Sequence, residues 1–161
     1  MHPAPWAAAG MEAPDHGISV ETTSEQNDRL HAYGRQLIDI HDRLRDSLDA
    51  LRSGQDADLG LHCLAFCAAV TEHHTGEDTG VFPALARQHP ELREVLAGLE
   101  RDHQTIATLL RRLAALAAQP DRAAIQAELD GLAAILESHF SWEERRLVRA
   151  LDTSVGLTGL S

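Results

Sequence analysis

The stretch VLAGLERDHQTIATLLRRLAAL (residues 95–116) repeats apolar side chains at steps of three and four residues. That period places Leu99, Ile106 and Leu113 on one face of a helix. His103 comes four residues after Leu99 and three before Ile106, so it lies on the same apolar face. The stretch therefore predicts a helix that packs against a core and carries an imidazole into it.

Three other segments show the same helical period, and no segment shows the alternation typical of a strand. The first helix ends near Leu51, the second spans about 57–88, and the fourth follows Asp121, which we expect to be its N-cap. Short turns separate the segments. Four amphipathic helices joined in this way favour an all-α fold, an antiparallel up-down-up-down four-helix bundle.

Length and composition indicate one globular domain. The chain has 161 residues, of which 43% are hydrophobic, which suits a single domain with its own core. We assign the bundle to residues 21–152. Residues 1–20, rich in Pro, Ala and Gly, and residues 153–161 show no periodicity, so we expect a disordered N-terminal tail and a loose C-terminal tail.

Charge and hydropathy exclude several classes of partner. The formal net charge is −11, and so acidic a surface repels nucleic-acid phosphates and anionic membranes. We therefore expect neither nucleic acid nor a membrane as a partner. Neither a secretory leader pattern nor an apolar run of membrane-spanning length is present, so we expect a cytoplasmic location. The sequence leaves the oligomeric state open.

Imidazoles and carboxylates occupy core-facing positions in all four predicted helices. The first and third helices each place one His in the apolar stripe, and the second and fourth each place a His four residues before a Glu. The candidate metal ligands are His41, His73, Glu77, His103, His139 and Glu143. Burying each of these groups without a partner would cost several kcal/mol. A metal centre would satisfy them together, because mixed imidazole and carboxylate donors suit iron and related transition metals.

Four segments also carry a resemblance to a known family. The motifs are IHDRLRDSL (40–48), EHHTGEDTGVFPAL (72–85), ERDHQTIATLL (100–110) and ESHFSWEERRLVRAL (137–151). They resemble the hemerythrin, or HHE cation-binding, family, from about Asp28 to Leu151. The resemblance implies two iron ions bridged by carboxylates and an oxo or hydroxo group. It also implies reactivity toward dioxygen, peroxide or nitric oxide.

The second helix allows an alternative pair of ligands. His74 and Asp78 are also four residues apart, and periodicity alone does not reject them. We prefer His73 and Glu77, because Glu reaches further than Asp and because the family's spacing from the carboxylate to Phe82 fits Glu77. In that register, His74 and Asp78 are expected to be surface groups or groups that contact the ligands from outside.

The pattern departs from that of the oxygen-carrying hemerythrins. Those carriers have a second His four residues after the His of the third helix, where this chain has Ala107. The chain is similar instead to the bacterial hemerythrin-like branch with His, His-x-x-x-Glu, His and His-x-x-x-Glu. Four imidazoles and two carboxylates leave open coordination positions, which favours redox chemistry or sensing over oxygen transport. An oxidoreductase acting on peroxide, nitric oxide or a small organic substrate, and a non-catalytic sensor of iron or dioxygen, both remain open.

Overall fold

The computed structural model describes residues 23–150, and the predicted tails at 1–20 and 153–161 lie outside these described residues. Helices account for nearly all of the described part, which contains no strand. The elements are α2 (Thr23–Arg52), α3 (Leu59–Gly76), η1 (Glu77–Val81), α4 (Phe82–Gln88), η2 (Pro90–Leu92), α5 (Arg93–Ala117), α6 (Arg122–Glu143) and η3 (Glu144–Val148).

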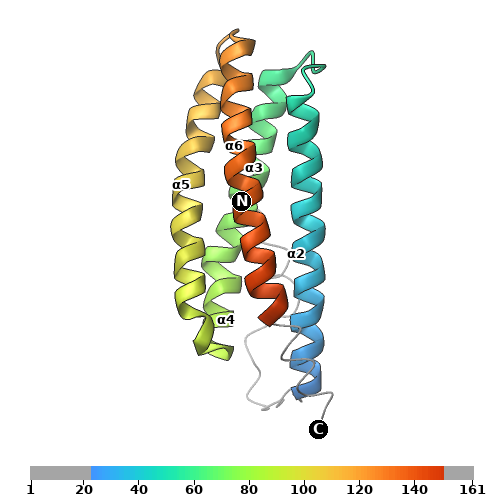
Figure 1. Ribbon diagram of the computed structural model, residues 1–161, viewed down its shortest axis with the longest axis vertical. Coiled ribbons are helices and arrows are strands. Elements are labelled where there is room, and N and C mark those ends of the chain that lie inside the picture. The colour runs from blue at the N-terminus through green and yellow to red at the C-terminus, as the bar shows by residue number, and fades with distance from the viewer. Residues whose placement is uncertain (1–22, 151–161) are drawn as a thin grey trace, which may run out of the picture.

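The four long helices form the predicted bundle. The chain runs up α2, down α3 and α4, up α5 and down α6 (Figure 1). α2 packs on α3 and α6, and α5 packs on the same two helices. The turns have identifiable signals: Gly54 adopts a φ of 77° after α2, a conformation that favours glycine. The side chain of Asp121 caps α6 by accepting from the Ala124 N–H at 3.0 Å. The all-α four-helix prediction is confirmed.

A π-helical turn interrupts the second predicted helix. α3 ends at Gly76, η1 spans Glu77–Val81, and α4 follows. A second π-helical turn, η3, follows α6 directly after Glu143. Both candidate carboxylates therefore lie where an α-helix changes into a π-helix. Such turns occur often at functional sites, since the extra residue changes the direction of the side chains around it.

The core consists of two apolar clusters. One contains residues such as Leu48, Phe66 and Leu113, and the other contains residues such as Phe82 and Leu99. Along each helix, a short polar segment separates the two clusters. We call this the polar layer; it comprises His41, His73, His74, Glu77, His103, His139 and Glu143. Of the helices that the structure describes, none combines the length and the apolarity needed to cross a membrane.

Candidate metal centre

All six predicted ligands lie in the polar layer, and each of the long helices contributes to it. α2 supplies His41, and α5 supplies His103. α3 supplies His73 near its end, and η1, which follows it, supplies Glu77 as its first residue. α6 supplies His139 and Glu143, one turn apart. His41 and Glu143 have no exposed surface at all, and Glu77 is 2% exposed.

The donor atoms of the layer form overlapping groups in which all atoms lie within 4.8 Å of one another. These groups are His41/His73/Glu143, His74/His103/His139, His73/His74/Glu77 and Glu77/His103/Glu143. Each carboxylate belongs to two groups. Glu77 and Glu143 thus connect a set of imidazoles on the α2 side with a set on the α5 side.

Individual distances show how close the donors are. Nε2 of His41 lies 3.2 Å from Nε2 of His73. Oε1 of Glu77 lies 3.4 Å from Nε2 of His73 and 3.4 Å from Nε2 of His103. Nε2 of His139 lies 3.3 Å from Oε2 of Glu143. The carboxylate of Glu77 therefore sits between imidazoles from two different helices.

Several of these buried atoms have no hydrogen-bond partner within the described residues. They are Nε2 of His74, His103 and His139, Oε1 of Glu77 and both carboxylate oxygens of Glu143. Leaving one such group unsatisfied costs about 1–3 kcal/mol. Because ionised carboxylates only accept hydrogen bonds and a neutral imidazole offers one lone pair, a cation at the centre of the layer would satisfy these atoms together. The donor set fits a transition metal.

In three of the histidines, the ring nitrogen that faces away from the layer contacts a carboxylate. Nδ1 of His41 lies 3.2 Å from Glu144, Nδ1 of His103 lies 2.7 Å from Asp78, and Nδ1 of His139 lies 3.2 Å from Asp102. A carboxylate at Nδ1 favours the tautomer that carries its proton there, which leaves the Nε2 lone pair directed into the layer. Asp78 thus contacts the candidate ligand His103 from outside the layer. This is one of the two positions expected for Asp78 when His73 and Glu77 are the ligands.

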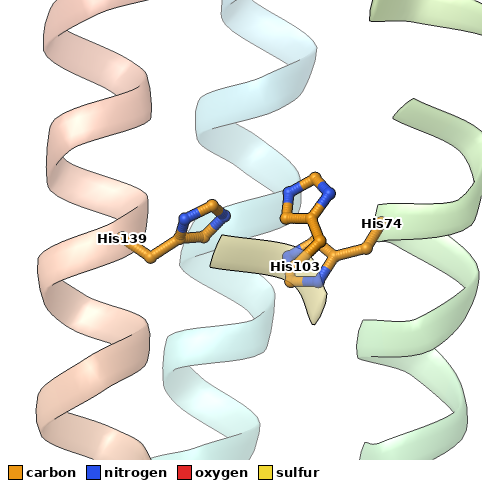
Figure 2. Close-up of side chains that lie close together, drawn as sticks. All are labelled: His74, His103 and His139. Carbon is orange, nitrogen blue, oxygen red and sulfur yellow. The ribbon is translucent and has the colours of Figure 1, made fainter. Parts of the chain in front are cut away.

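His74 lies deeper than expected, and a surface position for it is ruled out. It is 5% exposed, and its ring stacks on His103 with centroids 3.8 Å apart. Figure 2 shows His139 reaching from α6 toward this stacked pair. Consecutive helical residues point about 100° apart, so His73 turns toward His41 of α2 while His74 turns toward α5. Both His73 and His74 therefore reach the polar layer, although the sequence analysis treated them as alternatives.

Burial sets the charge state of the layer. Burial lowers the pKa of His73 to about 4, of His103 to about 3 and of His74 to about 2. Burial and the neighbouring charge of Glu143 raise the pKa of Glu77 well above its usual range. In the metal-free layer His73, His74 and His103 are therefore neutral, and Glu77 holds a proton. The pKa of His139 is raised instead, because its contacts with Glu143 and Asp102 outweigh its burial. A cation that binds must displace the proton of Glu77.

Tyr33 of α2 supports one of the carboxylates. Its hydroxyl donates to Oε2 of Glu77 at 3.2 Å. Burial, followed by the charges of Glu77 and Glu143, raises the pKa of Tyr33, so it remains a phenol that can donate. This contact leaves Oε1 of Glu77 directed at His73 and His103.

Residues 28–151 match the hemerythrin HHE cation-binding domain. The chain belongs to this family. The match spans almost the entire described bundle and includes every residue of the polar layer. Comparisons with curated proteins and with solved structures found no match. Membership of the hemerythrin family agrees with the geometry of the polar layer, whose His and Glu groups could hold a metal ion.

Proposed function

We propose that this hemerythrin domain holds two iron ions in the polar layer and reacts with, or binds, dioxygen, peroxide or nitric oxide in redox or stress handling. The observation that supports two ions is the sharing of carboxylates. Glu77 and Glu143 each belong to two donor groups, as carboxylates that bridge a pair of metals would. Paired iron supplies one-electron chemistry and Lewis acidity toward small oxygen- and nitrogen-containing ligands.

The chain divides its donors between two positions. His41 and His73 lie together beside Glu143, and His103 lies beside Glu77 and Glu143. His139 approaches Glu143 at 3.3 Å. When two ions are bound, the two Glu side chains would bridge these positions together with a hydroxo or oxo group. The carboxylates at Nδ1 of three histidines hold the rings in orientation and increase their basicity as donors.

The surroundings of the layer favour small ligands. The ring of Phe140 stacks on His41 with centroids 4.1 Å apart, and Phe82 lies 5.6 Å from the ring of His103. Apolar clusters close the layer on both sides. Such walls exclude bulk water and leave room for a diatomic molecule or peroxide more readily than for a large substrate.

A groove between α5 and α6 favours a second candidate, an oxidoreductase acting on a small organic substrate. The groove has a volume of about 1150 Å³, and His139, Trp142 and Ala134 line it. Ala134→Phe would narrow the groove without altering a polar-layer residue. Under this second function the variant would lower turnover of an organic substrate and leave peroxide reactivity unchanged.

The test is metal analysis of protein purified aerobically, with optical spectra before and after addition of hydrogen peroxide. We expect about two iron ions per chain and near-ultraviolet charge-transfer bands. Gas evolution with an unchanged spectrum would support peroxide turnover, and a stable new band would support binding or sensing. A folded protein that takes up no iron during anaerobic reconstitution would overturn the proposal.

A matched pair of histidine variants separates the site from the surface. His41→Gln removes a donor that is fully buried in the polar layer. His62→Gln changes an exposed histidine that contacts Asp56 at 2.6 Å and lies outside the layer. We expect iron content to fall in the first variant and to stay at the wild-type level in the second.

A further inference from the structure

We propose that His74 is itself a metal ligand, which completes a three-imidazole position together with His103 and His139. The proposal rests on the proposed metal centre and adds a fifth imidazole to it. It also makes the two metal positions unequal, because the other position retains only the imidazoles of His41 and His73.

The first argument is the burial of an unsatisfied nitrogen. His74 is 5% exposed, and its Nε2 has no hydrogen-bond partner among the described residues. A leucine or phenylalanine would fill the same space without this penalty, which is about 1–3 kcal/mol for an unsatisfied buried group. A position that keeps an imidazole at such a cost indicates that the nitrogen acquires a partner when the site is loaded.

The second argument is the convergence of three helices. His74 comes from α3, His103 from α5 and His139 from α6, and one ring nitrogen of each lies within 4.8 Å of the others. Two nitrogens bound to one ion at about 2.1 Å lie about 3–4 Å apart. The three rings therefore need to close in by less than about 2 Å to share one ion, a shift that rotations of the side chains can supply.

The third argument is ring orientation. The rings of His74 and His103 are nearly parallel, at 9°, while His139 meets His74 at 80° and His103 at 73°. Figure 2 shows the ring of His139 approaching the stacked pair from the opposite helix. The stack alone would suffice to pack His74 in the core. The approach of a third imidazole with an equally unpartnered Nε2 is what stacking does not explain.

Unequal donor sets have a measurable consequence. The position formed by His74, His103 and His139 has three imidazoles, and the position formed by His41 and His73 has two. Both positions would share the carboxylates of Glu77 and Glu143, each of which belongs to two donor groups. We therefore expect metal-free protein to load two ions in two steps of different affinity, with the three-imidazole position filling first.

The test is an anaerobic titration of the metal-free full chain with Co²⁺. Calorimetry measures the affinity of each step, and the visible bands of bound cobalt report its ligands. His74→Phe keeps an aromatic ring to stack on His103 but removes the donor. The control is His62→Gln on the same helix, whose parent histidine is exposed. We expect His74→Phe to weaken the tighter step by about tenfold or more and to change its cobalt spectrum, while the control behaves as wild type.

Two results are distinguishable from a failure of the metal centre itself. Wild-type protein that binds no Co²⁺ and no Fe²⁺ would overturn both proposals. Wild-type protein that binds two ions, with His74→Phe unchanged in both affinities and in its spectrum, would overturn only the role of His74. If His74→Phe does not fold, proton NMR of Co²⁺-loaded wild type decides: five shifted, exchangeable imidazole N–H signals support the proposal, and four overturn it.

Discussion

Oε2 of Glu144 lies 3.2 Å from Nδ1 of His41, the ring nitrogen opposite the one that faces the polar layer. Nη2 of Arg45 donates to the same oxygen at 2.6 Å. The contact joins η3 to α2 and fixes the rotation of an imidazole that has no exposed surface. Glu144 therefore orients His41, and it would act on the proposed metal centre through that side chain.

Removing this contact should weaken metal binding without unfolding the bundle. We expect Glu144→Ala to lower iron affinity by about 10- to 100-fold, the usual effect of losing a carboxylate that orients a ligand histidine. Competition with a chelator measures the affinity. Glu137→Ala is the matched control, because Glu137 accepts from Nε of Arg45 at 2.8 Å and does not contact His41. Equal affinities in the two variants would contradict the role of Glu144.

The bridging role of Glu143 can be tested by stoichiometry. Glu143→Gln keeps the shape of a side chain that is fully buried but replaces an anionic donor with a neutral amide. Glu143 belongs to two donor groups, one with His41 and His73 and one with Glu77 and His103. Because both groups lose an anionic donor, we expect metal content to fall from about two ions per chain to about one or fewer. Retention of two tightly bound ions would refute the bridge.

The metal-free protein should lose stability in mild acid. Burial lowers the pKa values of His73 and His103 to about 4 and about 3, whereas an unfolded histidine titrates near 6.5. Below that pH the unfolded chain takes up protons that the folded chain does not, so the free energy of unfolding falls with falling pH. The effect is complete only below the folded pKa values.

Other groups offset part of this slope. Burial raises the pKa of Asp78 to about 6 and raises that of Glu77 well above its usual range, so both hold protons in the folded state. We therefore expect a net loss of about 1–3 kcal/mol per pH unit between about pH 6 and pH 4. Urea denaturation of metal-free protein at several pH values measures it. A free energy of unfolding that stays constant or increases as the pH falls through this window would show that the folded protein does not hold these histidines neutral.

Substitution by alanine should have opposite effects on stability at Gly60 and at Gly131. A Cβ at Gly60 in α3 would lie 2.6 Å from the carbonyl oxygen of Ala117 at the end of α5. Because that neighbour is backbone, we expect Gly60→Ala to destabilise the fold by about 1–3 kcal/mol. A Cβ at Gly131 in α6 would meet nothing within 4 Å, so Gly131→Ala should stabilise by about 0.5–1 kcal/mol. Thermal unfolding of both variants checks the pair, and a shift of the same sign in both would be inconsistent with the close approach of α3 and α5.

Helix positions were predictable because their signal is local. Leu99, His103 and Ile106 share a face through the period of the helix alone, and all three are buried. Asp121 caps its own helix through a residue three positions along the chain. The π-helical turn at η1 was not predictable in this way. Gly76, Gly80 and Pro83 lie at or beside this turn, but neither these residue types nor the helical period distinguish a bend from an inserted residue.

From the sequence alone came the bundle, the family resemblance and the inward direction of the six candidate ligands, since each depends on spacing within one helix. The tertiary structure alone decided where the side chains at the edge of a helix's core-facing side point. His74 of α3 and Asp78 of η1 lie at the edge of the core face. The position of α5 places His74 in the polar layer, stacked on His103, and Asp78 beside Nδ1 of His103. A residue at such an edge can face either neighbour or solvent, and only the position of the adjoining helix selects among them.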